Sequence, residues 1–377
     1  MPWKEASVMS LRMEFVALAS TSGVSFRVLC KRYGISPKTG YKWLRRYSEA
    51  GKEGLLDLSR RPHHSPNRIS AELEERILAL RDEHPVWGPR KLHARLGEQE
   101  LARPSISTIA AVLKRNERIN PEDTSKHQTL TRFEAEHPNQ LWQMDFKGHF
   151  PLAEGTRCHP LTVLDDHSRF LLCLKACGDE AWETVQSHLT DSFRLYGLPN
   201  CMIFDNGSPW GSDLGHPYTP LGAWLIRLGI RVSHSRPRHP QTLGKDERLH
   251  RTLKAELLSR VGLRDMEDGQ AHFDQWRRMY NHERPHEALG MEVPARRYRP
   301  SGREFPEVLP PIEYGSGYIV RKVGGQGRIS IKGREVKVGR AFEGYPVGLL
   351  PTNADGHFDV YFCHERIAEI DITCRGT

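Results

Sequence analysis

The chain has 377 residues, of which 38% are apolar, and it contains 8 tryptophans. This length and composition predict roughly two to four globular domains with hydrophobic cores and exclude an intrinsically disordered chain. Residues 1–68 hold 13 Lys and Arg against 5 Asp and Glu, so they carry the whole net charge of +8. A positive field concentrated in one segment favours polyanions such as nucleic acid, and a solvated basic surface is the alternative.

The seven cysteines form neither a CxxC pair nor a disulfide-dense pattern, so we expect reduced thiols in a cytoplasmic protein. Apolar runs stay well short of the roughly 20 residues that span a bilayer, and the N-terminus lacks the apolar core of a signal peptide. We therefore expect no membrane partner.

The first 50 residues predict a helix-turn-helix domain. Residues 11–20 suit a helix, Ser25 precedes a second apolar repeat at helical spacing, and Gly34 ends that repeat. Ser36 is a good N-cap and is followed by proline, so a third helix is expected over 38–47. In this motif the last helix reaches base edges and phosphates, although an ordinary helical bundle with a charged outer face is the alternative. The candidate DNA contacts on it are Lys38, Thr39, Tyr41, Lys42, Arg45 and Arg46.

Residues 51–69 are predicted to form a basic linker, and 70–117 a second helix-turn-helix unit. The linker has no periodicity and contains breakers at both ends. The helices of the second unit bear cations that could touch backbone phosphates. A polar stretch over 118–134 then leads, as another linker, to the next domain. The candidate DNA contacts in these segments are Arg60, Arg61, Arg90 and Lys91.

Residues 135–300 alternate between strand and helix patterns, as in an α/β domain. Around Asp145, apolar and polar residues alternate, so the aspartate is expected on the strand face opposite an apolar stripe. The segment 160–175 predicts a hairpin, and a helix after it leads to a buried strand over 201–204. Asp205 follows that strand at once, and ligand sites in such sheets lie beyond the carboxyl ends of the strands. A turn-forming aspartate before Asn-Gly is the alternative.

A further helix is predicted from about residue 244 to 259, and it brings a third acid, Glu247. Glu247 and Lys254 are seven residues apart, so they lie on nearly one face, where one end could bind a metal and the other the DNA backbone. Taken alone, Glu247 with Arg251 is an ordinary surface ion pair. The cations of this helix that could contact DNA are Lys245, His250, Arg251 and Lys254.

The three acids Asp145, Asp205 and Glu247 come from distant stretches of the chain. Three carboxylates brought together by a fold are what two Mg2+ ions need to activate a water and a leaving oxygen at a phosphodiester. We therefore predict that these acids are catalytic residues and metal ligands, with Mn2+ able to replace Mg2+.

Four stretches carry motifs that are more specific together than singly: Trp142-Gln-Met-Asp145, Asp205-Asn-Gly-Ser208, the run from Pro240 to Glu247 with Lys254, and residues 280–290. Together they closely resemble the integrase core of bacterial insertion-sequence transposases of the DDE class. The resemblance implies a ribonuclease-H-like core over 135–300 that holds two Mg2+ ions on the three acids, with Lys254 touching the element end. It also implies a homo-oligomer, dimer or tetramer, on double-stranded DNA of the terminal inverted repeats and the target. In the family pattern, Asp165 and Asp166 belong to the scaffold.

The C-terminal part changes character. Residues 301–314 are predicted to be a linker, and 315–377 show short alternating segments separated by glycine turns, which predict a small antiparallel β-barrel. The expected fold is therefore multidomain, with N-terminal all-α helix-turn-helix units, a central α/β ribonuclease-H-like core and the barrel.

These features predict a DNA transposase that binds the terminal repeats of an insertion sequence and catalyses metal-dependent strand cleavage and strand transfer. It would act in the cytoplasm, associated with the nucleoid when bound to DNA. A non-catalytic DNA-binding regulator is one alternative, and it would leave the three acids without a role. A nuclease of the same fold that cuts without joining is the other.

Overall fold

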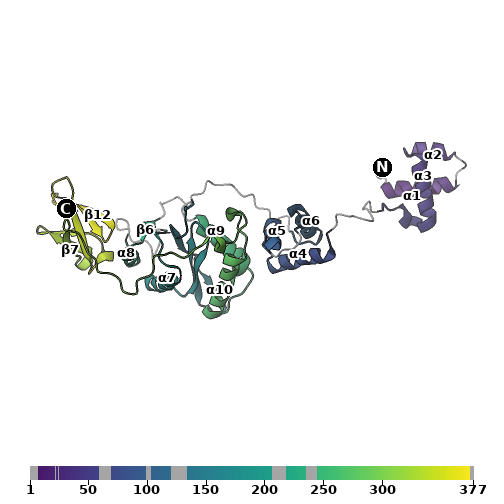
Figure 1. Cartoon of the computed structure of the whole chain (residues 1–377). Helices are drawn as coiled ribbons and strands as arrows, with labels where there is room; N and C mark the ends of the chain where they lie inside the picture. Colours follow the sequence, from purple (N-terminus) through teal and green to yellow (C-terminus); the bar gives the residue numbers. More distant parts are fainter. Residues whose placement is uncertain are drawn as a thin grey trace. The chain divides into compact units, whose positions relative to one another are not determined.

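The structure is a computed structural model that describes residues 7–21, 23, 25–58, 69–98, 103–119, 134–205, 218–234 and 244–373. It contains two compact units, Met1–Arg68 and Ile69–Thr377, and Figure 1 colours the chain along its sequence. In the described ranges, every helix is too short or too polar to cross a bilayer. The cysteines of those ranges are free thiols: Cys30, Cys158, Cys173, Cys177, Cys201 and Cys363.

The first unit packs its helices around a small core. Its elements are α1 (Val8–Thr21), α2 (Phe26–Arg32), α3 (Pro37–Ala50) and the 3-10 turn η1 (Gly51–Leu55). Ser36 caps α3, because its Oγ accepts a hydrogen bond from the Thr39 backbone N–H. Cys30 and Trp43 are buried between the helices. Gly40 permits the close approach of α3 to α2, since a Cβ at this position would lie 2.7 Å from the Cys30 Sγ. The predicted helical domain is confirmed.

The second unit begins with another set of helices, α4 (Ala71–Glu83), α5 (Pro89–Glu98) and α6 (Ile106–Arg115). Ser70 and Ser105 cap α4 and α6, each accepting a hydrogen bond from the backbone N–H three residues further on. Trp87 is buried in the core of this set. Arg95 donates a 2.8 Å hydrogen bond to Glu283 of the central domain, so the set contacts that domain.

The central domain is built on a mixed sheet. Its strands are β1 (Trp142–Phe146), β2 (Phe150–Pro151), β3 (Arg157–Asp165), β4 (Leu171–Cys177), β5 (Cys201–Phe204) and β6 (Arg231–His234). They lie in the order β2-β3-β1-β5-β6, with β4 paired to β3. The β3–β4 pair is the predicted hairpin, and β5 is parallel to both β1 and β6. The crossover helices α7 (Trp182–Tyr196) and α8 (Pro220–Arg227) connect the parallel strands.

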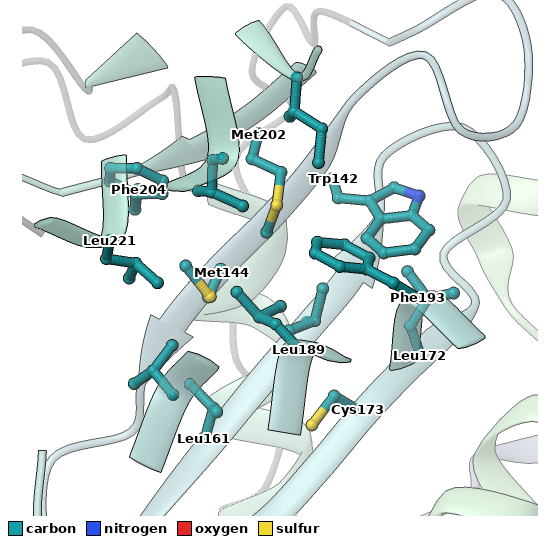
Figure 2. Close-up of a cluster of buried hydrophobic side chains, with 14 of the residues drawn as sticks. Trp142, Met144, Leu161, Leu172, Cys173, Leu189, Phe193, Met202, Phe204 and Leu221 are labelled. Atoms are coloured by element: carbon teal, nitrogen blue, oxygen red, sulfur yellow. The ribbon is translucent and has the colours of Figure 1, made fainter. Parts of the chain in front are cut away.

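Helices cover both faces of this sheet (Figure 1). On one face, α7 and α8 pack against Trp142 and Met144 in a cluster that Figure 2 shows. On the other lie α9 (Gly244–Leu253), the π-helical turn η4 (Lys254–Leu258) and α10 (Met266–His282). The 3-10 turn η5 (Glu287–Leu289) and the short helix α11 (Pro294–Arg297) follow α10. The predicted alternation along β1 is confirmed, because Trp142 and Met144 face α7 while Asp145 faces α9.

The C-terminal domain is entirely antiparallel. Its elements are β7 (Ile319–Lys322), η6 (Gly325–Gly327), β8 (Arg328–Ile331), β9 (Arg334–Lys337), η7 (Arg340–Phe342), β10 (Pro346–Pro351), β11 (His357–Phe362) and β12 (Glu365–Asp371). The strands form a four-stranded sheet, β12-β11-β10-β7, and a β8–β9 hairpin that share one core. That core includes Ala223 and Ile226 of α8, so α8 packs against both the central sheet and the C-terminal domain.

The segment predicted as a linker before the C-terminal domain packs on the central domain. The Arg303 guanidinium donates hydrogen bonds to the carbonyls of Pro199, Leu228 and Gly229. Phe305 adds its ring to the cluster around α7. The segment therefore connects the central and C-terminal domains, and its hydrogen bonds and ring packing fix it to the central domain.

Candidate active site

The pairing of β1 with β5 brings Asp145 and Asp205 together. The strands are parallel, with Gln143 opposite Ile203. Continued by two residues, the same register puts Asp145 beside Asp205 on one face of the sheet, where neighbouring strands lie about 4.8 Å apart. Asp205 is the first residue after β5, at the carboxyl end of a parallel strand. Two of the three predicted acids are therefore neighbours.

The electrostatics of this pair suit a cation. Burial, followed by the charge of Asp205, raises the pKa of Asp145 from its ordinary value to about 7. Two adjacent carboxylates resist joint ionisation unless a positive charge compensates them. The Asp145 side chain remains 28% exposed, so a solute can reach it. Carboxylate oxygens are the ligands that Mg2+ prefers. The residues present therefore fit a divalent cation between them.

Two acids begin α9, and they point in different directions. Glu247 is exposed, whereas Asp246 is fully buried and interacts electrostatically with Asp145 and Asp166. In the described ranges, neither carboxyl oxygen of Asp246 has a hydrogen-bond partner. Burial first, and then these two aspartates, raise the pKa of Asp246 well above its ordinary value. Asp246, rather than the predicted Glu247, thus occupies the side of α9 that faces Asp145.

Sequence reasoning missed Asp246, although a pattern could have revealed it. Asp246 stands three and seven residues before the buried Leu249 and Leu253, so it belongs to the apolar stripe of the helix. An acid in such a stripe is unusual.

Among the described residues, no three side chains of His, Cys, Asp or Glu are gathered closely enough to hold a metal ion.

His250 lies between α9 and β3 beside Asp145. Its Nε2 is 2.9 Å from the Thr162 Oγ1, and that hydroxyl donates a 2.9 Å hydrogen bond to the Asp145 carbonyl. Because a hydroxyl has one hydrogen, the His250 Nε2 must donate to Thr162. Burial, and then the Lys147 charge, lower the pKa of His250 to about 4, so its Nδ1 is unprotonated and lies 3.8 Å from the Asp145 Oδ2. Sequence reasoning missed Thr162, and the DNA contact of His250 stays a prediction.

Asp165 and Asp166 are scaffold residues, in agreement with their expected role. Asp165 accepts hydrogen bonds from the Ser168 and Asn139 backbone N–H groups. Asp166 accepts from the Gln143 amide and forms a 2.5 Å ion pair with Lys245. Both aspartates are fully buried. Their hydrogen bonds join the ends of β1 and β3 to the start of α9.

The predicted DNA contacts occupy varied surroundings. Lys38, Tyr41, Lys42 and Arg45 are exposed on α3, whereas Thr39 and Arg46 are half-buried. On α9 and η4, Arg251 and Lys254 are exposed, and so is Arg90 on α5. Lys91 is half-buried beside Arg284, and burial lowers its pKa to about 8. Arg60 and Arg61 lie outside the described residues.

Comparison with known families matches most of the chain in separate segments. A helix-turn-helix domain matches residues 11–63, and a homeodomain-like domain matches 39–113. Two integrase core domain families match 135–240 and 228–294. The family described as "IS481 family transposase, C-terminal domain" matches 318–377.

The individual proteins that the chain is similar to share a quarter or less of its residues in the aligned regions. An uncharacterized 31.7 kDa protein of insertion element IS407 from Burkholderia multivorans is 25% identical over 64% of this chain and 87% of its own length. An uncharacterized 39.2 kDa protein of insertion element IS476 from Xanthomonas euvesicatoria is 25% identical over 61% of this chain and 65% of its own. The HTLV-2 integrase catalytic core domain, solved in complex with magnesium, is 16% identical over 44% of this chain and 100% of its own, with a TM-score of 0.34.

The fold and these matches define a class of protein, a DNA-binding recombination protein with helix-turn-helix domains before an integrase core. The C-terminal match is more specific: residues 318–377 are similar to the C-terminal domain of IS481 family transposases, and the two bacterial relatives are insertion-element proteins.

Proposed function

We propose that this transposase binds the terminal inverted repeats of its insertion sequence as a homo-oligomer and then cleaves and joins DNA strands. It would do so on nucleoid DNA in the cytoplasm, as a dimer or tetramer. The observation that supports this most strongly is the pair Asp145 and Asp205, set in register at the ends of adjacent parallel strands. Acids at this edge of an α/β sheet are where ligand chemistry is expected.

Asp145, Asp205 and Glu247 would hold two Mg2+ ions, with Mn2+ as a substitute. When bound, the ions would supply a lowered pKa for the attacking hydroxyl or water and compensating charge for the departing oxygen. Asp145 is held for this task through its carbonyl by Thr162 and flanked by His250. Because one set of carboxylates serves either nucleophile, the same residues suit hydrolysis at an element end and strand transfer.

For a third acid to join Asp145 and Asp205, either the first turn of α9 moves or Asp246 takes the place of Glu247. Glu247 is exposed while Asp246 faces Asp145, so the first turn of α9 would have to rotate to present Glu247 to the pair. A rotation by one residue, about 100 degrees, would bring Glu247 to the direction in which Asp246 now points. We propose Glu247 as the ligand, because water can reach it and because the DDE resemblance places it there.

DNA would be held by cations on two surfaces. On α3 the exposed candidates are Lys38, Tyr41, Lys42 and Arg45, with Thr39 and Arg46 behind them. Near the acids, Arg251 and Lys254 would contact the backbone of the element end. The remaining candidates, Arg60, Arg61, Arg90, Lys91, Lys245 and His250, keep the same proposed role.

The test compares carboxylates with isosteric amides. Asp205→Asn and Glu247→Gln should each lower Mg2+-dependent cleavage of an element-end duplex by more than about 100-fold, because each removes a ligand charge worth several kcal/mol. DNA affinity in a gel-shift assay should stay unchanged. Asp191→Asn, at an exposed aspartate of α7, is the matched control.

The outcomes separate the candidate functions. Full cleavage by Asp205→Asn would remove the catalytic assignment. If Asp246→Asn is inactive while Glu247→Gln is active, Asp246 is the third acid and α9 need not turn. Cleavage without joined products on a target plasmid would indicate a nuclease, and binding without any cleavage would indicate a regulator.

A further inference from the structure

A pocket of about 530 Å3 lies between the β2–β3 hairpin and the π-helical turn η4, and Lys147, two residues after Asp145, belongs to its lining. Its volume is within the range of about 300–1,000 Å3 that is typical of small-ligand pockets. Much of the lining is apolar, and two lysines also belong to it. The residues that matter here are Lys147, Phe150, Leu152, Lys254, Leu258 and Val261.

The pocket is built by backbone contacts. The Ala153 N–H donates to the Leu263 carbonyl at 3.0 Å, which fixes the hairpin to the segment after η4. The Ser259 N–H donates to the Lys254 carbonyl at 2.9 Å, five residues back, as in a π-helix. Lys254, Leu258 and Ser259 of this turn all line the cavity. Such π-turns are rare in proteins, and those that occur are often found at functional sites.

The two lysines of the pocket suit an anion. Lys147 is half-buried, and its ammonium group is close enough to that of Lys254 for the two charges to interact. In the described ranges neither ammonium group forms an ion pair. Lys147 stands two residues after Asp145, so both side chains lie on the same side of the strand. An anion here would relieve the repulsion of the lysines and lie next to the proposed catalytic pair.

We infer that this pocket binds one unpaired nucleotide of the DNA strand next to the reacting phosphodiester, an assignment that rests on the proposed function. Lys147 and Lys254 hold its phosphate, and the base enters the apolar part between Phe150 and Leu258. A base inside a duplex cannot enter a side pocket, so the terminal pairs must open. Stacking on an aromatic ring and apolar contact compensate the lost base stacking.

The experiment uses the full chain and the element-end duplex that it cleaves. 2-Aminopurine is placed in turn at each position within three nucleotides of the cleavage site, and its fluorescence is measured on binding to the Asp205→Asn variant. At one position the 2-aminopurine fluorescence should rise by roughly twofold or more, because the base leaves its stack. Leu258→Trp fills the pocket and should abolish this rise. Leu195→Trp, the same change at a leucine of α7 that is 64% exposed, is the control and should keep it.

The possible results are distinct. If wild-type protein cleaves this duplex while fluorescence stays at the duplex level at every position, the lysines contact only paired backbone and the pocket assignment is wrong. A rise that survives Leu258→Trp also overturns it. If the wild-type protein does not cleave the duplex in Mg2+, the proposed function fails, and the pocket assignment fails with it.

Discussion

The two faces of the central sheet differ in what they bury. Toward α7 and α8, the buried side chains are apolar and form one cluster with Trp142, Phe193 and Phe204 (Figure 2). Toward α9 and α10, the sheet also buries apolar side chains, and beside them it buries Thr162 and Asp166 under Asp246 and His250. One strand, β1, contributes to both faces by alternation.

The difference teaches that the buried polar groups near the proposed acids are gathered on one face of a single layer, although both faces bury apolar side chains. Apolar burial stabilises the first face by roughly 25 cal/mol per Å2 removed from water. Burial of carboxyl groups on the second face opposes folding unless they find partners. Asp246 has no hydrogen-bond partner in the described ranges, so the apolar side chains buried on the same face, such as Leu249 and Phe273, must offset the cost of burying it.

The largest expected effect on stability is at the apolar face. Phe193→Ala should lower the free energy of unfolding by about 3–5 kcal/mol, because it leaves a cavity where the ring packs against Trp142 and Trp224. Chemical denaturation monitored by tryptophan fluorescence measures this. A loss below about 1 kcal/mol would mean that the face can collapse around the gap, and the comparison of the two faces would fail.

A change of opposite sign is expected on the polar face. Asp246→Val should raise the free energy of unfolding by about 1–3 kcal/mol, since it removes a buried carboxyl without hydrogen-bond partners. The same denaturation assay measures it, and Asp191→Val on the surface of α7 serves as the control. Destabilisation by Asp246→Val would show that the carboxyl group has a stabilising role in the fold.

The smallest expected change in stability concerns the contact that holds Asp145. Thr162→Val keeps the shape of the side chain and removes both hydrogen bonds, so unfolding should become easier by about 1 kcal/mol. Cleavage should require about 10-fold more Mg2+, because support behind the proposed metal ligand Asp145 is lost. A Mg2+ titration of cleavage measures the shift. An unchanged Mg2+ requirement together with lower stability would reduce Thr162 to a structural residue.

Part of the site could be predicted because its information is local. The alternation around Asp145 identifies the strand face that carries the acid, since side chains of a strand alternate with a period of two. Asp205 is recognisable from the apolar strand before it. Caps such as Ser36 and Ser105 are equally local, because each bonds a backbone N–H only three residues away.

The amino-acid sequence by itself determined which segments become helices and strands and which acids stand at their ends. Only the tertiary structure decided that Asp145 lies beside Asp205, that Asp246 faces inward from α9, and that Thr162 pairs with His250. Periodicity fixes which residues share a face of one element. It does not fix which element that face meets, because the meeting depends on strand order and helix docking between residues far apart along the chain.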